Sequence, residues 1–212
     1  MLLPLNQSAT RPARLAVLSY DIAHPRRARR VRAILEPLQL GRQYSVFEVR
    51  LPIPAVHGLL AECTSQLDLR QDRLALWWPR DGVRLSWVSG KPGPSMAGAF
   101  GGGADARNDA AATLAPASNF VVCYDMSDPD SLREMGRLVA ARGAMVQRSV
   151  YWLRMPARAV DALMARCVRT LQPGDRFWVY PLQNAGMLWR VGEREEPALF
   201  PIGRHHWRED PR

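Results

Sequence analysis

The first hydrophobic pattern of the chain is the run RLAVLSY (residues 14–20), whose consecutive apolar and β-branched side chains are typical of a buried strand. The run ends at Asp21, and His24-Pro25 then predict a helix start, because proline is favoured in the first helical turn. Over residues 26–40 apolar side chains recur three and four positions apart. This spacing predicts one buried helix face, made of Ala28, Val31, Ile34, Leu35 and Leu38.

The next pattern, at residues 42–51, alternates as a strand does, with Tyr44, Val46 and Glu48 on one face and Ser45, Phe47 and Val49 on the other. A run of this kind forms either two sequence-adjacent strands or one long bent hairpin arm.

A second helix is predicted over residues 52–67, and strands are predicted at 72–79 and 82–90. The helix is opened by Pro54, and its buried positions are Val56, Leu59, Leu60 and Cys63. Strand, helix, strand, strand, helix, strand is the order of a ferredoxin-like unit, here with one extra terminal strand.

The whole pattern occurs twice at a constant offset. NFVVCYDMSDP (119–129) repeats LAVLSYDIAHP (15–25), and QRSVYWLRMP (147–156) repeats QYSVFEVRLP (43–52). Cys167 corresponds to Cys63; one residue then drops out, so that Asp175-Arg176-Phe177 aligns with Asp72-Arg73-Leu74. A repeat of this length indicates a duplicated structural unit.

The repeat predicts an α+β protein of two tandem ferredoxin-like (βαββαβ plus extra terminal strand) domains. A unit of roughly 75 residues has a marginal core by itself, so we expect the two to pack as an intramolecular pseudo-dimer. The predicted parts are a first repeat, a flexible Gly/Ala/Pro linker, a second repeat and a C-terminal tail, at residues 14–90, 91–118, 119–192 and 193–212.

Composition narrows the classes of function. The chain is 47% hydrophobic and 23% charged, which is ordinary for a globular protein. Its cysteines, Cys63, Cys123 and Cys167, fit neither a disulfide framework nor a metal-ligand spacing. No apolar stretch approaches the length of a membrane span, and the N-terminus lacks a secretory signal pattern. We therefore expect a cytoplasmic protein with no membrane partner.

The net charge of +9 changes this picture. Only Lys91 is a lysine among 29 basic residues, an excess of arginine that a GC-rich genome would also produce. A basic surface nevertheless attracts polyanions, and arginine pairs bidentately with phosphate.

Five of the arginines crowd the first two turns of the first predicted helix: Arg26, Arg27, Arg29, Arg30 and Arg32. Cations there oppose the helix dipole, so an anionic ligand would explain them; the alternative is a solvated helix face. In the second copy the positions of Arg26, Arg27 and Arg30 hold Asp130, Ser131 and Glu134. The two copies are therefore predicted to share a fold but not a surface.

The Tyr-Asp strand ends (YDI and YDM), the basic first helix, the segments QYSVFE and QRSVYW, and the segment WVSGKP together resemble the CRISPR-associated Cas-two family. The resemblance covers residues 14–92 and 119–192. It implies a dimer packed sheet to sheet, in which the last strand of each protomer extends the partner's sheet. Within this one chain, residues 83–89 would join the second unit and 186–192 the first, so no further homodimer would be needed.

The resemblance also implies a function in spacer acquisition, the adaptation step of CRISPR antiviral defence. The protein would bind duplex DNA (a prespacer) and bridge two dimers of the Cas-one integrase. Arg26, Arg27, Arg29 and Arg30 would contact duplex phosphates without reading sequence. Weaker candidates are Arg14, Arg42, Arg133, Arg137 and Arg148.

An alternative implied by the same resemblance is a metal-dependent endonuclease acting on RNA or DNA, with Asp21 and Asp125 as catalytic and Mg²⁺-binding residues. Two carboxylates meeting across a pseudo-twofold axis could hold one Mg²⁺, which would activate water for phosphodiester hydrolysis. In the other interpretation each aspartate caps the following helix or accepts loop N–H bonds. No histidine recurs, since His24 corresponds to Asp128, so the repeat supplies no general base. A third interpretation is a duplicated scaffold that has lost both DNA and metal.

The tryptophans Trp77, Trp78, Trp152 and Trp178 could stack on bases, as in single-strand binders. They lie in strand patterns beside apolar residues, so we interpret them as core or inter-sheet packing. The role of the tail, as a docking strand for a partner or as a disordered end, stays open.

Overall fold

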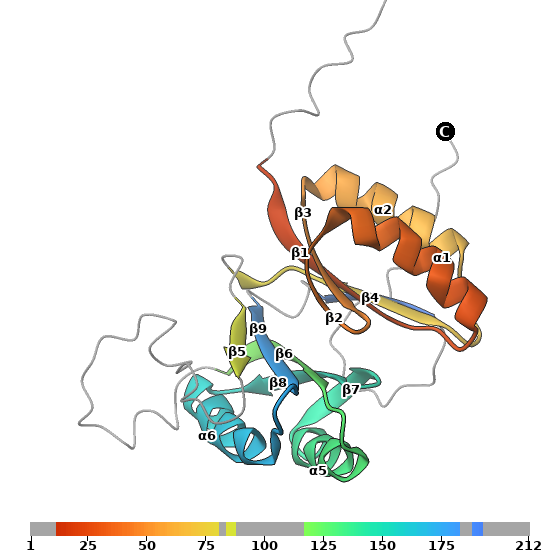
Figure 1. The fold of residues 1–212 in the computed structure, drawn as a ribbon. Coiled ribbons are helices and arrows are strands. Elements are labelled where there is room, and N and C mark those ends of the chain that lie inside the picture. Colours follow the sequence, from red (N-terminus) through yellow and green to blue (C-terminus); the bar gives the residue numbers. More distant parts are fainter. Residues whose placement is uncertain (1–11, 81–83, 88–116, 183–187, 193–212) are drawn as a thin grey trace, which may run out of the picture.

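The computed structural model describes residues 12–80, 84–87, 117–182 and 188–192. Two antiparallel sheets face each other, and each carries a pair of helices on its outer side (Figure 1). We refer to residues 14–87 as the first half and to residues 118–191 as the second half. Residues 91–116 of the predicted linker and the whole predicted tail lie outside the described residues, and the predicted domain boundaries stay predictions.

The first half follows the predicted order of elements. Its strands and helices are β1 (Arg14–Asp21), α1 (Pro25–Leu35), the 3₁₀ turn η1 (Glu36–Leu38), β2 (Gln39–Gln43), β3 (Val46–Leu51), α2 (Ile53–Ser65), β4 (Arg73–Trp77) and β5 (Leu85–Trp87). The second half repeats them as β6 (Ser118–Asp125), α5 (Pro129–Ala140), β7 (Gly143–Gln147), β8 (Val150–Met155), α6 (Ala157–Cys167), η3 (Val168–Thr170), β9 (Arg176–Leu182) and β10 (Leu188–Val191).

The last strand of each half is exchanged. One five-stranded sheet has the order β10-β4-β1-β3-β2 and the other β5-β9-β6-β8-β7. In Figure 1 the blue β10 therefore lies beside β4 of the first half, and the yellow β5 lies beside β9 of the second. The intramolecular pseudo-dimer predicted from the repeat and the strand exchange implied by the family resemblance are both confirmed.

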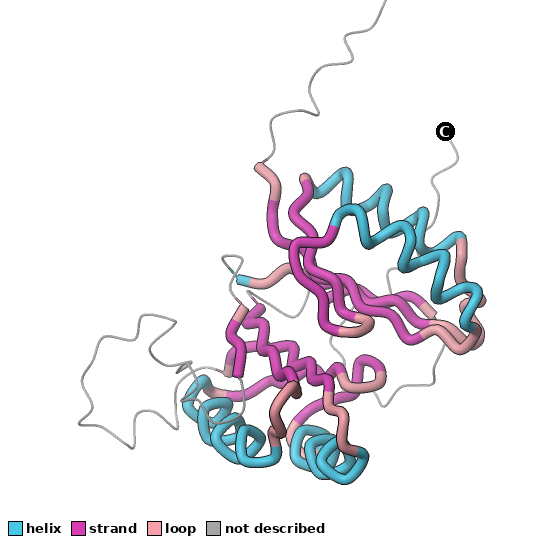
Figure 2. The backbone as a smooth tube through the Cα atoms, in the orientation of Figure 1, coloured by secondary structure: helices cyan, strands magenta, loops and turns pink. Residues whose placement is uncertain are grey.

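Among the described residues, three apolar clusters hold these layers together. One lies between α1, α2 and the first sheet, the second between α5, α6 and the second sheet, and the third between the two sheets. The alternation of strand side chains creates this arrangement: in β1, Leu18 faces the helices while Val17 faces the opposite sheet. Figure 2 shows the resulting order of helices, sheet, sheet, helices.

The first helix is shorter than predicted. It ends at Leu35, because Pro37 has no amide hydrogen to continue the helical hydrogen bonds, and the chain turns through η1 into β2. Leu38, predicted to be on the buried face, is 38% exposed and this prediction is wrong.

The alternating run at residues 42–51 forms two strands, which settles the alternative left open by its pattern. Tyr44 and Ser45 make the turn between β2 and β3, and Tyr44 adopts a φ of 46°. Glu48 faces the second half, and Phe47 and Val49 face the helices, as the alternation predicted.

Candidate nucleic-acid interface and carboxylate pair

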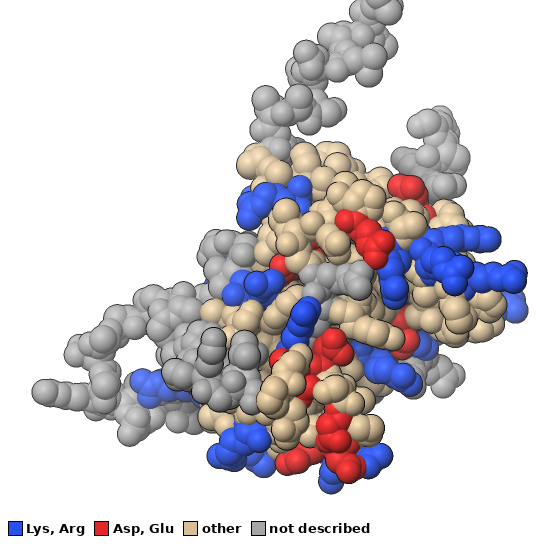
Figure 3. Space-filling view, in the orientation of Figure 1, with Lys and Arg blue, Asp and Glu red and all other residues tan. Residues whose placement is uncertain are grey.

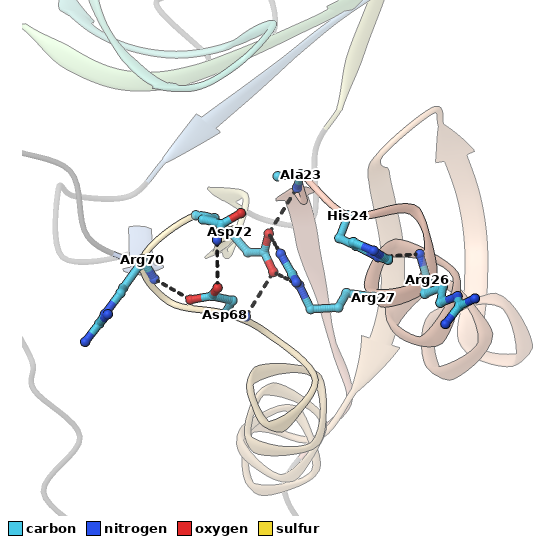
Figure 4. A network of polar contacts seen from close by, with 8 residues as sticks. Ala23, His24, Arg26, Arg27, Asp68, Arg70 and Asp72 are labelled. Atoms are coloured by element: carbon cyan, nitrogen blue, oxygen red, sulfur yellow. Dashed lines mark hydrogen bonds and ion pairs between the residues drawn. The ribbon is translucent and has the colours of Figure 1, made fainter.

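A buried carboxylate, Asp72, holds the segment that leads from β1 into α1 (Figure 4). It accepts hydrogen bonds from the backbone amides of Ala23 (3.0 Å) and Asp68 (2.9 Å). It also forms a bidentate ion pair with Arg27, whose Nε and Nη2 lie 2.5 and 3.0 Å from its two oxygens. One side chain thus ties the start of α1 to the loop between α2 and β4.

The charge state of Asp72 follows from these contacts. Burial alone would raise its pKa, but the hydrogen bonds from Arg27 and from the amides of Asp68 and Ala23 outweigh burial and hold the pKa below its ordinary value. The same hydrogen bond raises the pKa of Arg27. The pair is therefore ionised throughout the neutral range.

Asp175 does the same work in the second half with neutral partners. It accepts hydrogen bonds from the amide and hydroxyl of Ser127 (3.0 and 3.2 Å) and from the amide of Gln172 (2.8 Å). The residue missing from the repeat lies in this loop, which instead turns at Gly174 with a φ of 95°. We call Asp72 and Asp175 the bracing aspartates.

The repeat aligns the bracing aspartates with each other, but the sequence alone indicates no role for them. The available signal was an acidic residue repeated directly before a buried strand, Asp72 before β4 and Asp175 before β9. An ionisable side chain at the same place in both copies of an otherwise divergent surface indicates a structural demand. The partners that tie each bracing aspartate to the segment before the first helix of its half lie 45 to 49 residues away along the chain, so the pattern alone could not name them.

By holding Ala23 and Arg27, Asp72 fixes the start of α1, the helix from which the arginines project. His24 caps the helix, its Nδ1 accepting from the amide of Arg26 at 3.1 Å, and Pro25 is the first helical residue, as predicted. Arg26, Arg29 and Arg30 are exposed, and basic side chains gather over this end of the molecule, at the right of Figure 3. We call these three residues the α1 arginine cluster. No acidic residue offsets their charge in the first turn.

The other two arginines of α1 are directed inward. Arg27 is held by Asp72, and Arg32 Nε donates to the hydroxyl of the buried Tyr20 at 3.3 Å. Both are half-buried. Their guanidinium groups therefore stabilise the position of α1 beneath the exposed cluster.

The equivalent end of the second half has a different charge. Asp128 caps α5 through the amide of Ser131 (2.7 Å), and this hydrogen bond lowers the pKa of Asp128. Arg133 forms an ion pair with Asp130, and Arg137 Nε lies 3.4 Å from the carbonyl of Arg133. The predicted nucleic-acid residues of α5 are thus exposed, but part of their charge is offset locally.

Arg14 lies apart from both helix ends. It begins β1, whereas the α1 arginine cluster follows the far end of the same eight-residue strand. At about 3.3 Å per residue, roughly 20 Å separate the two ends. Arg148 is exposed beside the β7–β8 turn, and Arg42 lies in β2.

The sequence did not single out a further group of basic residues, which lies between the two helices of the second half. Shallow hollows between α5 and α6 are lined by Glu134 and by Arg137, Arg142, Arg166 and Arg169. Arginines near helix C-termini complement the dipole, so these positions are accounted for by the helices themselves.

Asp21 and Asp125 occupy equivalent places at the ends of β1 and β6. Strand alternation puts them on the inner faces of the two sheets, and each is half-buried. Arg73 lies across from Asp21 and Arg176 across from Asp125 in the strand pairing. His24 and Asp128 are the actual helix caps, so the interpretation of Asp21 and Asp125 as caps is wrong.

The surroundings of this carboxylate pair limit what it can bind. Neither carboxylate makes a hydrogen bond or ion pair with another described residue. Within the described ranges no group of three or more His, Cys, Asp and Glu side chains could hold a metal ion. Two carboxylates alone would leave most ligand positions of a Mg²⁺ to water, which is common for this ion.

The four tryptophans singled out from the sequence are packing residues, as interpreted there. Trp77, Trp152 and Trp178 are buried in the cluster between the sheets, and Trp78 is buried beneath the helices of the first half. None of these rings is available as a platform for bases. No helix among the described residues is long and apolar enough to cross a membrane.

Comparisons with known proteins match both halves. The family described as "CRISPR associated protein Cas2" matches residues 14–80 and, separately, residues 119–187. A curated relative from Nitrosomonas europaea, named CRISPR-associated endoribonuclease Cas2 1, is 30% identical over 81 residues, which span 38% of this chain and 77% of the relative. A solved structure of a hypothetical protein from Thermus thermophilus is 29% identical, with 39% of this chain and 95% of that chain covered and a TM-score of 0.32.

Proposed function

The chain belongs to the CRISPR-associated Cas2 family, with both halves matching it, and on this basis we propose that it is the duplex-DNA-binding scaffold of spacer acquisition. In this function it bridges dimers of the Cas-one integrase in the cytoplasm. Because the two Cas2 units are joined in one chain, a single molecule supplies the complete scaffold.

The α1 arginine cluster carries the DNA-binding part of the proposal. Arg26, Arg29 and Arg30 are exposed on one helix end, and no acidic residue lies in that turn. Like charges at a helix N-terminus destabilise the helix, and contact with phosphates would relieve this cost. The bidentate Asp72–Arg27 pair makes the platform rigid, so the cluster is preorganised for a rigid duplex.

Such contacts position a duplex without reading its bases. This suits a scaffold that must accept prespacers of unrelated sequence. Arg14, Arg133 and Arg137 are proposed as peripheral contacts, since they lie away from the cluster or have part of their charge offset.

The alternative function is a metal-dependent endonuclease. It is favoured by the printed name of the Nitrosomonas relative and by the half-buried Asp21 and Asp125, which have no partner among the described residues. In this alternative the two carboxylates would hold a Mg²⁺, which would supply the activated water. The repeat supplies no histidine as a general base.

One paired assay separates the two functions. Wild type, Asp21→Ala/Asp125→Ala and Arg26→Ala/Arg29→Ala/Arg30→Ala are incubated with short duplex DNA and with single-stranded RNA at two salt concentrations, with and without Mg²⁺. The scaffold predicts salt-sensitive duplex binding that survives the aspartate changes and is lost with the arginines. Mg²⁺-dependent cleavage that vanishes in the aspartate variant would favour the nuclease instead.

A further inference from the structure

The contact between the two sheets buries a carboxylate. Glu48 of β3 is 6% exposed, and its Oε1 accepts from the hydroxyl of Tyr180 in β9 at 3.0 Å. Its Oε2 lies 2.7 Å from Nη1 of Arg84, which directly precedes β5. Glu48, Tyr180 and Arg84 therefore form a carboxylate triad that joins β3 of the first half to β9 and β5 in the sheet of the second half.

The surroundings are fitted to this triad. The Arg84 guanidinium carbon lies 4.7 Å from the centre of the Trp178 ring, a cation–π contact. In β2, the backbone passes the ion pair at Gly41, where an added Cβ would lie 2.6 Å from Glu48 Oε2 and 3.4 Å from Arg84 Nη1. The second copy has Met145 at the position of Gly41.

The symmetry-related position has no triad. In the repeat alignment Glu48 corresponds to Trp152, Tyr180 to Trp77 and Trp178 to Ala75. Trp152 and Trp77 are both buried between the sheets. Trp77 packs edge-on against Tyr180, with ring centres 5.7 Å apart and planes at 66°. Tyr180 and its repeat equivalent Trp77 thus lie against each other, but Tyr180 has the polar partner Glu48 and Trp77 has aromatic neighbours.

We infer that the carboxylate triad is a pairing determinant, which makes the inner face of the second half accept a first-half face and reject a copy of itself. In a pair of second halves, each Tyr180 would face Trp152 where it now faces Glu48. An indole carries a donor and no acceptor. Each such pair would therefore bury two phenolic protons without an acceptor, and an unsatisfied buried donor is costly.

The triad disfavours pairs of second halves but not pairs of first halves. In a pair of first halves, Glu48 would face Trp77, whose Nε1 is a donor that is buried without a hydrogen-bond partner among the described residues. That pair would keep its carboxylate satisfied. Tyr180 is therefore the residue that enforces mixed pairing, and Glu48 is the acceptor that it selects.

Arg84 couples this selection to the strand exchange. It lies at the beginning of β5, and it is β5 in register with β9 (Leu85 opposite Val179) that carries Arg84 to Glu48. The triad thus forms when the correct half has docked and its last strand has crossed. The triad acts in assembly of the protein, and its effect does not depend on nucleic-acid binding.

The test lets the halves choose partners. A protease site is placed in residues 91–118 of the full chain, and the folded protein is cleaved, unfolded in urea and refolded at high concentration. Native mass spectrometry then counts the three kinds of pair. We expect first–second pairs to dominate and second–second pairs to fall at least about tenfold below the statistical share, as two unsatisfied hydroxyls imply.

Tyr180→Phe removes the hydroxyl and should raise the second–second share several-fold. Tyr124→Phe is the matched control, because Tyr124 is buried beneath α5 and α6, away from the inner face. Statistical pairing in the wild type, or equal effects of the two Tyr→Phe changes, would overturn the inference.

A second measurement covers the case in which the cleaved halves do not refold. In the intact chain, Glu48→Met and Tyr180→Phe are combined in a double-mutant cycle by urea unfolding. Each single change should raise the unfolding equilibrium constant. The triad predicts that the rise in the double variant is about fivefold to tenfold smaller than the product of the two single rises. Independent effects would show that the residues do not act together, which would also overturn the inference.

Discussion

The beginnings of α1 and α5 are equivalent places in a duplicated fold, and they differ in almost every surface residue. α1 is capped by His24 and carries the exposed Arg26, Arg29 and Arg30 in its first turns. α5 is capped by Asp128 and carries Asp130 and Glu134. Asp128 and Asp130 suit the positive end of the helix dipole. The charges at the start of α5 therefore stabilise that helix. The arginines at the start of α1 destabilise theirs, which binding to an anion would explain.

Beneath both ends the bracing aspartates are retained. Asp72 and Asp175 each accept the amide of the residue before the cap and an amide from the loop that precedes the next strand. What differs is the third partner, the Arg27 guanidinium in the first half and the Ser127 hydroxyl in the second. After duplication, therefore, the surface could diverge while the internal connection that positions it was kept.

The largest effect on stability is expected from removing the charged brace. Asp72→Ala leaves Arg27 and two backbone amides without their acceptor, which should cost about 2–4 kcal/mol in free energy of unfolding. Asp175→Ala removes only hydrogen bonds from uncharged donors and should cost less. Urea unfolding of both variants measures the difference. Equal losses would contradict the distinction drawn between the halves.

The next effect concerns the α1 arginine cluster. Arg26→Ala/Arg29→Ala/Arg30→Ala should weaken duplex binding about 10- to 100-fold near 0.1 M salt and reduce the slope of log K against log salt by up to about 3. The control, Arg142→Ala/Arg166→Ala/Arg169→Ala, removes the same charge from the second half. If both variants lost equally, net charge and not the α1 end would govern binding.

The pH dependence of stability provides a smaller effect. Since the folded-state pKa of Asp72 is held below its ordinary value, its ionised form stabilises the fold. That contribution is complete above about pH 4 and is lost as the pH falls through the folded-state value. The gap in urea midpoint between wild type and Asp72→Asn should therefore narrow on acidification. A gap that stayed constant down to pH 2.5 would rule out this linkage.

The smallest effect is expected at the helix cap. His24→Asp gives α1 the cap residue of α5, which should stabilise the protein by about 0.5–1 kcal/mol. The added carboxylate lies beside the arginine cluster and should weaken duplex binding a few-fold. Thermal unfolding of this variant should show higher stability than the wild type, and duplex titration should show lower affinity. A variant that gained both stability and affinity would contradict the proposed compromise.

Most of the fold could be predicted from the sequence, because its period-two and helical patterns occur twice and agree. The main error, Leu38, arose because a single proline overrode an apolar spacing that otherwise continued. The strand exchange came from the family resemblance, since no local pattern in residues 84–87 or 188–191 specifies which sheet they join.

The candidate site was less predictable. The exposed arginines could be recognised from their density alone, but Arg27 could not be separated from Arg26, because the partner that turns it inward is 45 residues away. Glu48 was placed on the correct strand face, yet its contact with Tyr180 spans 132 residues. Such contacts depend on the packing of two sheets, which residue spacing does not encode.

The exchange of β10 has a consequence for synthesis on the ribosome. Strand β4 in the first sheet pairs on one side with β10, which is synthesised only after the first half, the segment between the halves and the rest of the second half. Until then β4 is an open edge on the emerging polypeptide, able to recruit strands from neighbouring nascent chains. Translation that stops before Leu188 would leave this edge permanently uncovered, so quality control of the newly made protein should depend on β10.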